Sequence, residues 1–443
     1  MAYIFGDRDV SSVGFVGFGK STRGVYSYLS ERYRDLSFTV RDRRELPLPC
    51  GVRGFFGENE LSNIDEDVLF LSPTVRRERL ELTLASERGV RLTSDAEFFF
   101  DNFSGEALAV TGSNGKSTTA TLASLITGFS AIGNIGEPMT PHASSAEAFV
   151  LELSSFQLNY FTPKTRRALI TNIVPNHLDW HTSFEEYREA KLRLAYLADE
   201  FIICADSEEL LLARFERVPF ALYSIHKTPR ELFQLRAEHY LYLDGGYLML
   251  DGERIASAAQ LLRREYHNVQ NALGAMALSI GYADRDRMAE AILGFRGLPH
   301  RCEYVGAIGG VEFYDSSIDS TPERTAQTLS ALPGKSTVIL GGRSKGLDPE
   351  PLIAALQRSA SAIILTGENK EELRAALRAG GTDDTIRTLE ASDFEEAVRL
   401  GYECTLPYGR LILSPASTSY DRFSNFEERG NCFKEVFLSL KGR

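Results

Sequence analysis

The most informative segment of the chain is Ala107-Leu108-Ala109-Val110-Thr111-Gly112-Ser113-Asn114-Gly115-Lys116-Ser117-Thr118-Thr119. An apolar run leads into a glycine turn, and a lysine and a serine then open a helical pattern over residues 120–126. Glycines let backbone N–H groups approach phosphate oxygens, and the helix N-terminus favours negative charge. The order of strand, glycine turn and helix therefore predicts a phosphate-binding loop.

The loop differs from the common pattern G-x-x-x-x-G-K-[ST], because Val110 stands at the first glycine position. Lys116 is expected to reach the β- and γ-phosphates of ATP, and the Ser117 hydroxyl to contact Mg²⁺. The alternative is a glycine turn that binds no ligand, but such a turn needs no Lys-Ser pair. The predicted cofactor-binding residues are Gly112, Ser113, Asn114, Gly115, Lys116, Ser117 and Thr118.

Length and composition exclude several classes of protein. A chain of 443 residues is expected to hold several domains. It has no apolar run of the roughly 18–20 residues that a membrane span needs, and its start lacks the pattern of a signal peptide. Five cysteines without C-x-x-C spacing favour a reducing cytoplasm, and a net charge of −12 argues against nucleic acid as a partner.

Residues 1–93 alternate strand and helix patterns. A strand pattern over residues 12–17 ends in the turn Gly17-Phe18-Gly19-Lys20-Ser21, and the strand pattern over residues 37–42 ends in Asp42. Glycine turn, helix, strand and carboxylate in this order predict half of a Rossmann-like domain. Thr22 replaces the third glycine of the dinucleotide pattern, so a turn that binds no nucleotide stays open and hydride transfer is not supported.

Residues 94–296 are predicted to form the domain of the phosphate loop. Glu152 interrupts the apolar run over residues 148–157 and is expected to need a cation, here Mg²⁺, or else an ion pair in the core. His177 follows the next strand pattern, and is either a metal ligand, a phosphate contact or a loop histidine. Ser183 and Glu186 predict a capping box for a helix whose Lys191 would, by composition alone, lie on the surface.

Residues 297–443 are predicted to form a third α/β domain. Gly297 and Pro299 mark the joint that precedes it. Polar clusters follow several of its strand patterns, as expected at the rim of a binding crevice. The expected strands cover residues 311–315, 337–342, 362–366 and 410–414.

Taken together, the motifs of this chain resemble those of the Mur ligases and the folylpolyglutamate synthetases. The C-terminal runs over residues 414–423 and 425–430 look like the Mur ligase branch that adds D-glutamate, and the D-N-P-R segment of the branch that adds diaminopimelate or lysine is absent. The other matching motifs are Thr111-Gly112-Ser113-Asn114-Gly115-Lys116-Ser117, Glu152-Leu153-Ser154-Ser155-Phe156-Gln157-Leu158, Asn176-His177-Leu178-Asp179, Tyr187-Arg188-Glu189-Ala190-Lys191, His267-Asn268-Val269-Gln270-Asn271-Ala272, Leu298-Pro299-His300-Arg301 and Leu340-Gly341-Gly342.

The resemblance implies an α/β protein of three domains: a Rossmann-like domain that binds the UDP substrate, a central P-loop domain with a mostly parallel sheet, and a C-terminal Rossmann-like domain that binds the amino acid. It further implies an enzyme that joins D-glutamate to UDP-N-acetylmuramoyl-L-alanine, and the protein is expected to be a cytoplasmic monomer. The substrate carboxylate would attack the γ-phosphate of ATP, and the amine of D-glutamate would then attack the acyl phosphate. Such a reaction needs positioned charge, which a lysine loop and Mg²⁺ supply.

The resemblance also assigns roles to single residues. Lys116, His177 and Lys191 would be catalytic, with Lys191 carbamylated, and two Mg²⁺ sites would be held by Ser117, Glu152, His177 and Lys191. Asn271 and Arg301 would bind ATP. The implied substrate-binding residues are Gly19, Lys20, Ser21, Asp42, Asn134, Ser320, Thr321, Lys345, Ser419 and Phe426.

Three features depart from the family pattern, and one of them is Gly24, which lies two residues beyond the third glycine position of the N-terminal turn. Residues 315–321 read Asp-Ser-Ser-Ile-Asp-Ser-Thr where the family often has Asn-Asp-Ser-Lys-Ala-Thr-Asn, and Thr74 replaces the glycine of a Ser-Pro-Gly segment. Either Ser320 or Thr321 would then supply the hydroxyl for D-glutamate. The alternatives are a sister ligase with another amino acid, a folylpolyglutamate synthetase, and a nucleotide-binding relative without catalysis.

Overall fold

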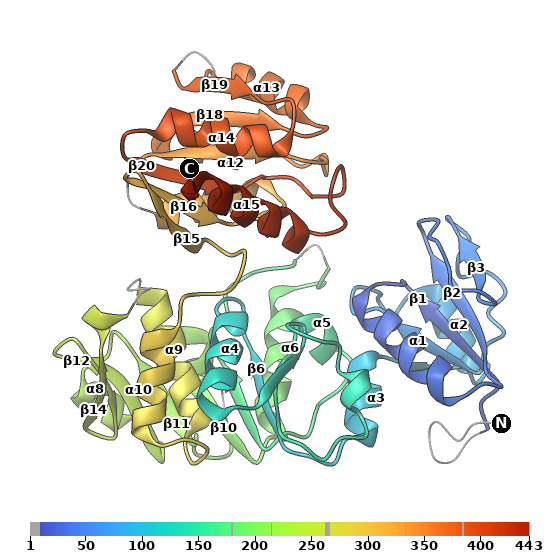
Figure 1. Cartoon of the computed structure of the whole chain (residues 1–443). Coiled ribbons are helices and arrows are strands. Elements are labelled where there is room, and N and C mark those ends of the chain that lie inside the picture. Colours follow the sequence, from blue (N-terminus) through green and yellow to red (C-terminus); the bar gives the residue numbers. More distant parts are fainter. Residues whose placement is uncertain are drawn as a thin grey trace. The chain divides into compact units, whose positions relative to one another are not determined.

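The computed structural model describes residues 9–178, 180–213, 215–261, 266–332, 334–382 and 385–442, and it confirms the α/β class (Figure 1). The strands form three separate sheets. The chain divides into two compact units: Met1–Phe295, which holds the first two sheets, and Arg296–Arg443, which holds the third. The domain limits expected at 93/94 and 296/297 stay predictions.

The first sheet is fully parallel, in the order β3-β2-β1-β4-β5. Its central strand β1 is buried along most of its length, because helices follow the strands and cover the sheet. The elements are β1 (Ser12–Val16), α1 (Lys20–Arg32), β2 (Ser37–Asp42), β3 (Arg53–Phe56), β4 (Val68–Leu71), α2 (Leu80–Glu87), β5 (Arg91–Thr93) and α3 (Asp95–Asn102).

The second sheet has the order β14-β13-β12-β11-β10-β9-β6-β8-β7, and its strands are parallel except for the antiparallel pairs β12–β13 and β13–β14. Its strands are β6 (Ala107–Thr111), β7 (Ser130–Gly133), β8 (Phe149–Glu152), β9 (Arg167–Ile170), β10 (Glu200–Cys204), β11 (Ala221–Ser224), β12 (His239–Asp244), β13 (Tyr247–Leu250) and β14 (Glu253–Ser257). Its helices are α4 (Lys116–Thr127), α5 (Ser155–Leu158), α6 (Phe184–Tyr196), α7 (Glu208–Leu212), α8 (Pro229–Gln234), α9 (Tyr266–Ser279) and α10 (Arg285–Gly294), with 3₁₀ turns at Thr140–His142 and Ala258–Gln260.

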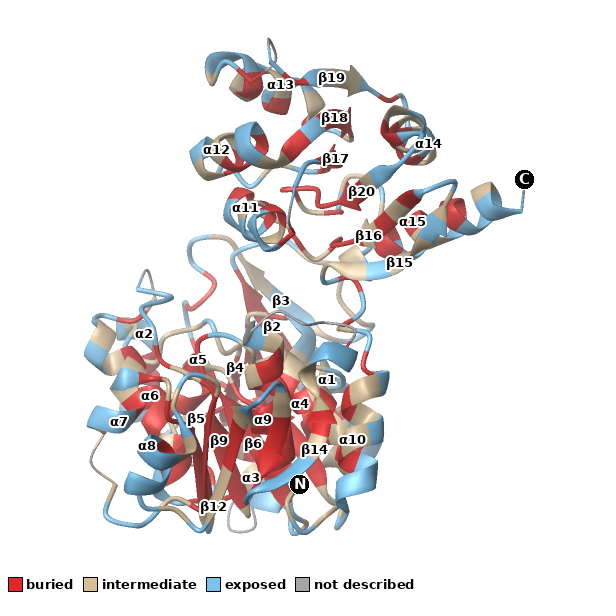
Figure 2. Ribbon diagram, turned by 90° about the vertical axis from the view of Figure 1, so that its left-hand side faces the viewer, coloured by how far each residue is buried: buried red, intermediate tan, exposed pale blue. Residues whose placement is uncertain are grey.

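The third sheet has the order β15-β16-β20-β17-β18-β19, with only the edge strand β15 antiparallel. Buried residues gather on the strands and on the helix faces that cover them (Figure 2). The elements are β15 (Glu303–Ile308), β16 (Val311–Asp315), α11 (Pro322–Ala331), β17 (Ser336–Gly341), α12 (Glu350–Ser359), β18 (Ala360–Thr366), α13 (Lys370–Ala379), β19 (Arg387–Glu390), α14 (Phe394–Thr405), β20 (Gly409–Leu413) and α15 (Phe426–Lys441).

The sequence patterns located the buried strands better than the edges. The hairpin with its turn at Gly245-Gly246 is confirmed as β12–β13. The strand expected over residues 148–157 ends at Glu152 instead, because Ser154 caps the short helix α5 and Gln157 completes a capping box. Edge strands such as β15 and β19 bury few residues and so gave no continuous apolar run. None of the helices in the described residues is long and apolar enough to cross a membrane.

A buried ion pair organises the first sheet beside its glycine turn. The Arg41 side chain is fully buried in β2, and its Nε donates to Glu66 Oε1 at 2.8 Å. Its other nitrogens donate to the backbone carbonyls of residues 60, 62 and 63. Burial by itself would raise the pKa of Glu66, but hydrogen bonds from Arg41 and Thr39 outweigh it and leave this pKa lowered. Removing one partner would leave a buried charge without compensation.

We predict that Arg41→Met lowers the free energy of unfolding by about 3–5 kcal/mol, because Glu66 would stay buried without its counterion. Chemical denaturation followed by circular dichroism measures this change. The matched control is Arg53→Met, since Arg53 forms a solvent-exposed pair with Asp65 at 3.6 Å, and its loss should change stability by less than about 1 kcal/mol. Equal effects of the two substitutions would contradict the prediction.

Candidate active site

The phosphate loop joins the buried strand β6 to helix α4 and requires both of its glycines. Gly112 and Gly115 have φ angles of 144° and 82°, a region that side chains rarely adopt. A Cβ on Gly112 would lie 1.9 Å from Thr171 Oγ1, and a Cβ on Gly115 would lie 2.2 Å from Asn271 Oδ1. The glycines therefore let the loop pass close to β9 and to α9.

Hydrogen bonds from the end of β9 hold the loop in place. Asn172 accepts the N–H of Asn114 through Oδ1 at 3.0 Å and the N–H of Ser113 through its carbonyl at 2.8 Å. Thr171 Oγ1 donates to the Asn114 carbonyl at 2.6 Å. Lys116 Nζ folds back over the loop and donates to the Gly112 carbonyl at 2.9 Å. The loop is thus ordered by its own neighbours, as a preformed anion site requires.

Glu152 ends the neighbouring strand β8 with its side chain buried. Its Oε1 accepts a hydrogen bond from Asn134 Nδ2 at 2.8 Å, and its Oε2 has no hydrogen-bond partner among the described residues. Glu152 attracts the charge of the buried Lys191, and the metal ligand and the ion pair in the core both stay predictions for it. A buried carboxylate oxygen without a partner costs free energy, and Mg²⁺ is the kind of ligand that satisfies it.

Lys191 lies on α6 and is buried at the loop, so its assignment to the surface from composition is wrong. Its side chain is about 2% exposed, and Nζ donates to the Gly112 carbonyl at 2.8 Å. Burial lowers the pKa of Lys191 well below its usual value, and the charge of Lys116 lowers it further, whereas Glu152 acts in the opposite direction. Burial and the charge of Lys116 therefore make the neutral amine easier to form at the edge of the loop.

The segment after β9 carries His177, which is exposed and has a φ angle of 55°. Its ring lies 4.9 Å from that of Phe156. Its role as a metal ligand stays a prediction, and Asp179, which belongs to the same motif, lies outside the described residues. Asn271, expected at ATP, is buried on α9 with its side-chain oxygen next to Gly115.

The capping box expected at Ser183 and Glu186 is only half right. Ser183 Oγ accepts the N–H of Glu186 at 3.1 Å. The Glu186 carboxylate, however, accepts hydrogen bonds from Thr182 N and Arg76 Nη2 and does not return to Ser183. Arg76, which follows β4 of the first sheet, binds the Glu186 carboxylate in place of the Ser183 N–H, because a charged donor forms the stronger hydrogen bond.

In the first sheet, Asp42 orders the glycine turn. Its Oδ2 accepts the N–H of Phe18 and its Oδ1 accepts the N–H of Arg44, each at 3.0 Å. Burial raises the pKa of Asp42, but these hydrogen bonds and the charge of Arg44 outweigh burial and leave the pKa lowered. Gly19 and Lys20 lie exposed in this turn, and Lys20 Nζ donates to the Gly136 carbonyl. Ser21 follows in the first turn of α1, partly exposed.

In the second unit, Lys345 Nζ donates to Ser320 Oγ at 3.2 Å, so these two predicted substrate residues lie together. Burial lowers the pKa of Lys345, and the neighbouring charge of Arg324 lowers it further. Thr321 caps α11 by accepting the N–H of Arg324. The remaining predicted residues of this unit are the exposed Arg301, the buried Ser419 and Phe426 at the start of α15.

Two buried groups of the second unit were not assigned roles from the sequence. Arg429 is about 2% exposed and donates to the Ser317 side chain and to the carbonyls of Ser317 and Ser417. His300, Glu303 and Asp315 form a cluster of metal-ligand type. Lys434 Nζ lies 2.7 Å from Glu303, so this cluster already has a cation. Arg429 and His300 belong to motifs of the family resemblance, and this was the only signal in the sequence that pointed to them.

His181 generates a prediction for pH. It is buried, its Nε2 lies 3.0 Å from Ser155 Oγ, and burial lowers its pKa to about 4. Because the unfolded chain takes up the proton near pH 6.5, stability should fall as the pH decreases from about 6.5 to about 4. Urea unfolding over this range should show a weaker pH dependence in His181→Phe. An unchanged dependence would contradict the prediction.

Two known protein families match this chain, one over most of the second sheet and one over the third. Residues 110–279 match the Mur ligase middle domain, and residues 300–417 match the Mur ligase, glutamate ligase domain. The first match contains the phosphate loop, Glu152, His177, Lys191 and Asn271. The second contains Arg301, Ser320, Thr321 and Lys345.

Curated relatives match over nearly the whole chain. UDP-N-acetylmuramoylalanine–D-glutamate ligase from Acetivibrio thermocellus is 34% identical, over 97% of this chain and 96% of the relative. The protein of the same name from Symbiobacterium thermophilum is 33% identical, over 96% of this chain and 97% of the relative.

Solved structures show the same fold at lower identity. UDP-N-acetylmuramate-alanine ligase from Thermotoga maritima has a TM-score of 0.58 and 18% identity, and covers 98% of this chain and 100% of its own. A pseudomurein peptide ligase type C from Methanothermus fervidus has a TM-score of 0.52 and 16% identity, over 97% of this chain and 100% of its own. On the identity and coverage of its curated relatives, this chain belongs to the Mur ligase family.

Proposed function

We propose that this protein is an ATP-dependent ligase that joins D-glutamate to UDP-N-acetylmuramoyl-L-alanine in the synthesis of peptidoglycan precursors. The names of its relatives support the substrates. The observation that carries the reaction type is the pairing of two buried groups at the glycine loop: Glu152, with one oxygen lacking a partner, and Lys191, with a lowered pKa. Both arrangements cost stability and therefore call for a functional reason.

The loop suits the triphosphate of ATP, with Lys116 as its cation and Asn271 beside Gly115. Ser117, Glu152, His177 and Lys191 offer the oxygen and nitrogen ligands for the proposed Mg²⁺ sites. Bound Mg²⁺ would neutralise phosphate charge and orient the γ-phosphate. The carboxamide of Asn134 donates to Glu152 Oε1. This contact leaves the other carboxylate oxygen, Oε2, unused.

The lowered pKa of Lys191 supports its carbamylation. A neutral amine nitrogen can attack the carbon of CO₂ and lose one proton, which gives a carbamate with two oxygens. The modified side chain would then be an anionic oxygen ligand at the same position, next to Glu152. This chemistry explains why a lysine lies buried at a phosphate loop that already holds Lys116.

The reaction then has two steps. The carboxylate of the UDP substrate attacks the γ-phosphorus of ATP and releases ADP, and the amine of D-glutamate attacks the resulting acyl phosphate and releases phosphate. Lys116 balances the charge that moves onto the leaving oxygen. Lys345 is the cation proposed for a carboxylate of D-glutamate, with Ser320 beside it. The turn from Gly17 to Ser21 is proposed for the UDP part.

The substrates are tested by phosphate release from ATP with UDP-N-acetylmuramoyl-L-alanine and, separately, D-glutamate, L-glutamate, L-lysine and diaminopimelate. We expect release with D-glutamate alone. Release with another amino acid would identify a sister ligase instead, and a need for a folate substrate would identify a folylpolyglutamate synthetase. Lys116→Ala is the control for the loop and should lower turnover by at least about 10²-fold, because it removes the cation at the phosphates.

Carbamylation is tested by Lys191→Ala. We expect this variant to lose most of its activity and to regain a large part of it when short-chain carboxylic acids are added, since they can replace the carbamate oxygens. In the wild type, the carbamate on Lys191 should also be detectable by mass spectrometry as a mass increase after it is chemically trapped. Failure of every carboxylic acid to restore activity would contradict the carbamate.

A further inference from the structure

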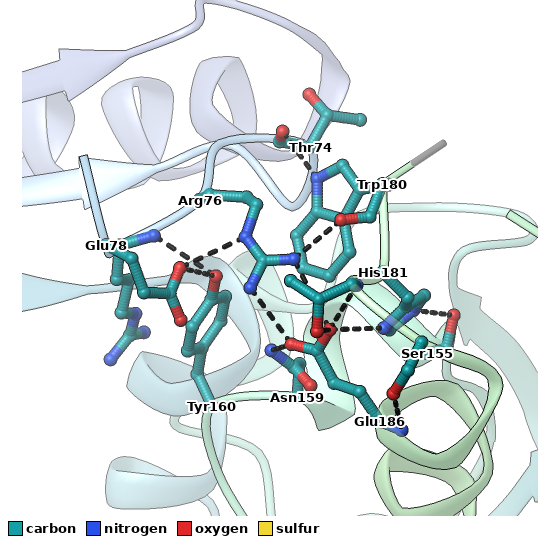
Figure 3. Close-up of polar contacts among 12 residues, drawn as sticks. Thr74, Arg76, Glu78, Ser155, Asn159, Tyr160, Trp180, His181 and Glu186 are labelled. Atoms are coloured by element: carbon teal, nitrogen blue, oxygen red, sulfur yellow. Dashed lines mark hydrogen bonds and ion pairs between the residues drawn. The ribbon is translucent and has the colours of Figure 1, made fainter. Parts of the chain in front are cut away.

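The segment that follows β4 lies against the start of α6, and polar contacts join them (Figure 3). Ser72, Pro73 and Thr74 come directly after β4, at the carboxyl end of a parallel strand, which is the edge where such sheets bind ligands. Arg76 follows two residues later. The other side of this contact is formed by Trp180, His181 and Glu186. In the sequence, these residues lie between the proposed metal ligands His177 and Lys191.

Arg76 makes three different contacts across this boundary. Its Nη2 donates to Glu186 Oε1 at 2.9 Å, and its Nη1 donates to the Trp180 carbonyl at 2.6 Å. Its guanidinium also lies 4.8 Å from the centre of a Trp180 ring. On its own side, Nε donates to Glu78 Oε2 at 3.2 Å. Only a planar guanidinium donates in these directions at once, so a lysine cannot replace it.

The contacts of Trp180 and Glu186 close the network. Trp180 Nε1 donates to the Thr74 carbonyl at 2.8 Å, so the indole reaches back to the segment that follows β4. Glu186 also accepts from Thr182 N and Asn159 Nδ2, which ties the start of α6 to the chain before it. Burial raises the pKa of Glu186, but the hydrogen bonds from Arg76 and Thr182 outweigh burial and lower it to about 2, so the ion pair persists at neutral pH.

A second tie runs beside the first. Tyr160 OH accepts the N–H of Arg77 at 3.1 Å and donates to Glu78 Oε2 at 2.9 Å. It joins the same segment to the region after α5 without involving α6. Because this tie remains when Arg76 is replaced, the loss of Arg76 should loosen the boundary locally and leave both sheets folded.

We propose that Arg76 is a positioning residue for the ligase reaction: it aligns the segment after β4 with the segment of His177 and the helix of Lys191. The inference rests on the proposed function, in which the carboxylate of the UDP substrate must reach the γ-phosphate of ATP. A displacement of about 1 Å between reacting groups can lower a rate by roughly 10²-fold. The Arg76 contacts join the segment after β4 to the segment that carries His177 and Lys191, so their loss would allow these two segments to shift relative to each other.

The kinetic test compares Arg76→Met and Arg76→Lys with the matched control Arg166→Met. Arg166 lies directly before β9 and pairs with Glu200 at the start of β10, at 2.6 Å. We expect both Arg76 variants to lower kcat/KM for the UDP substrate by about tenfold to 100-fold. The affinity for ATP should change little, because Thr171 and Asn172 hold the phosphate loop. Equal kcat/KM in Arg76→Met and wild type, or a tenfold or larger loss in the binding affinity for ATP, would overturn the proposal.

Fluorescence gives a test that does not need activity, because Trp180 is the one tryptophan of the chain. In Arg76→Met, acrylamide should quench Trp180 more strongly than in the wild type, with a melting temperature close to that of the wild type. Glu186→Gln should give the same change, and the double variant little more, since both side chains act in one network. Unchanged quenching in Arg76→Met would overturn the proposal. If quenching rises but the wild type ligates none of the tested amino acids, the proposed function fails and the contact between the segments stands.

Discussion

The site depends on burying an amine and a carboxylate next to the same glycine loop. Lys191 Nζ donates to the carbonyl of Gly112, and Glu152 keeps one oxygen without a partner among the described residues. Each burial is costly by itself, and the two groups do not form a hydrogen bond to each other. A protein keeps such a pair when a ligand completes it, and strand β8 and helix α6 hold its two members in position.

The three sheets share one geometric rule, which explains where their polar residues lie. Parallel strands end at the same edge, so the turns that follow them come together there. Asp42, the loop after β6, Glu152 and the residues after β16 all lie at such ends. Arg41 is an exception, because this charged residue is buried inside the first sheet and not at a strand end. Its hydrogen bond to Glu66 holds the strand that ends in Asp42.

Particular residues show how far sequence reasoning reached. The phosphate loop and the need of Glu152 for a partner followed from local patterns, because a glycine turn and an interrupted apolar run are visible in the chain itself. Lys191 was assigned to the surface by composition, and only the family resemblance placed it at a metal. The second half of the capping box failed for Glu186, because its partner Arg76 is far away in the sequence.

The α/β class, the position of the phosphate loop and the residue types available for ligands can be read from the chain, since they depend on neighbours within a few residues. Which charged side chains are buried, and which groups they pair with, depends on the folded structure. Burial of Lys191 and His181, the contacts of Arg76 with Trp180, and the free oxygen of Glu152 all arise between segments distant in sequence. Packing sets the pKa of a group and the partners of its hydrogen bonds, and no local pattern contains that information.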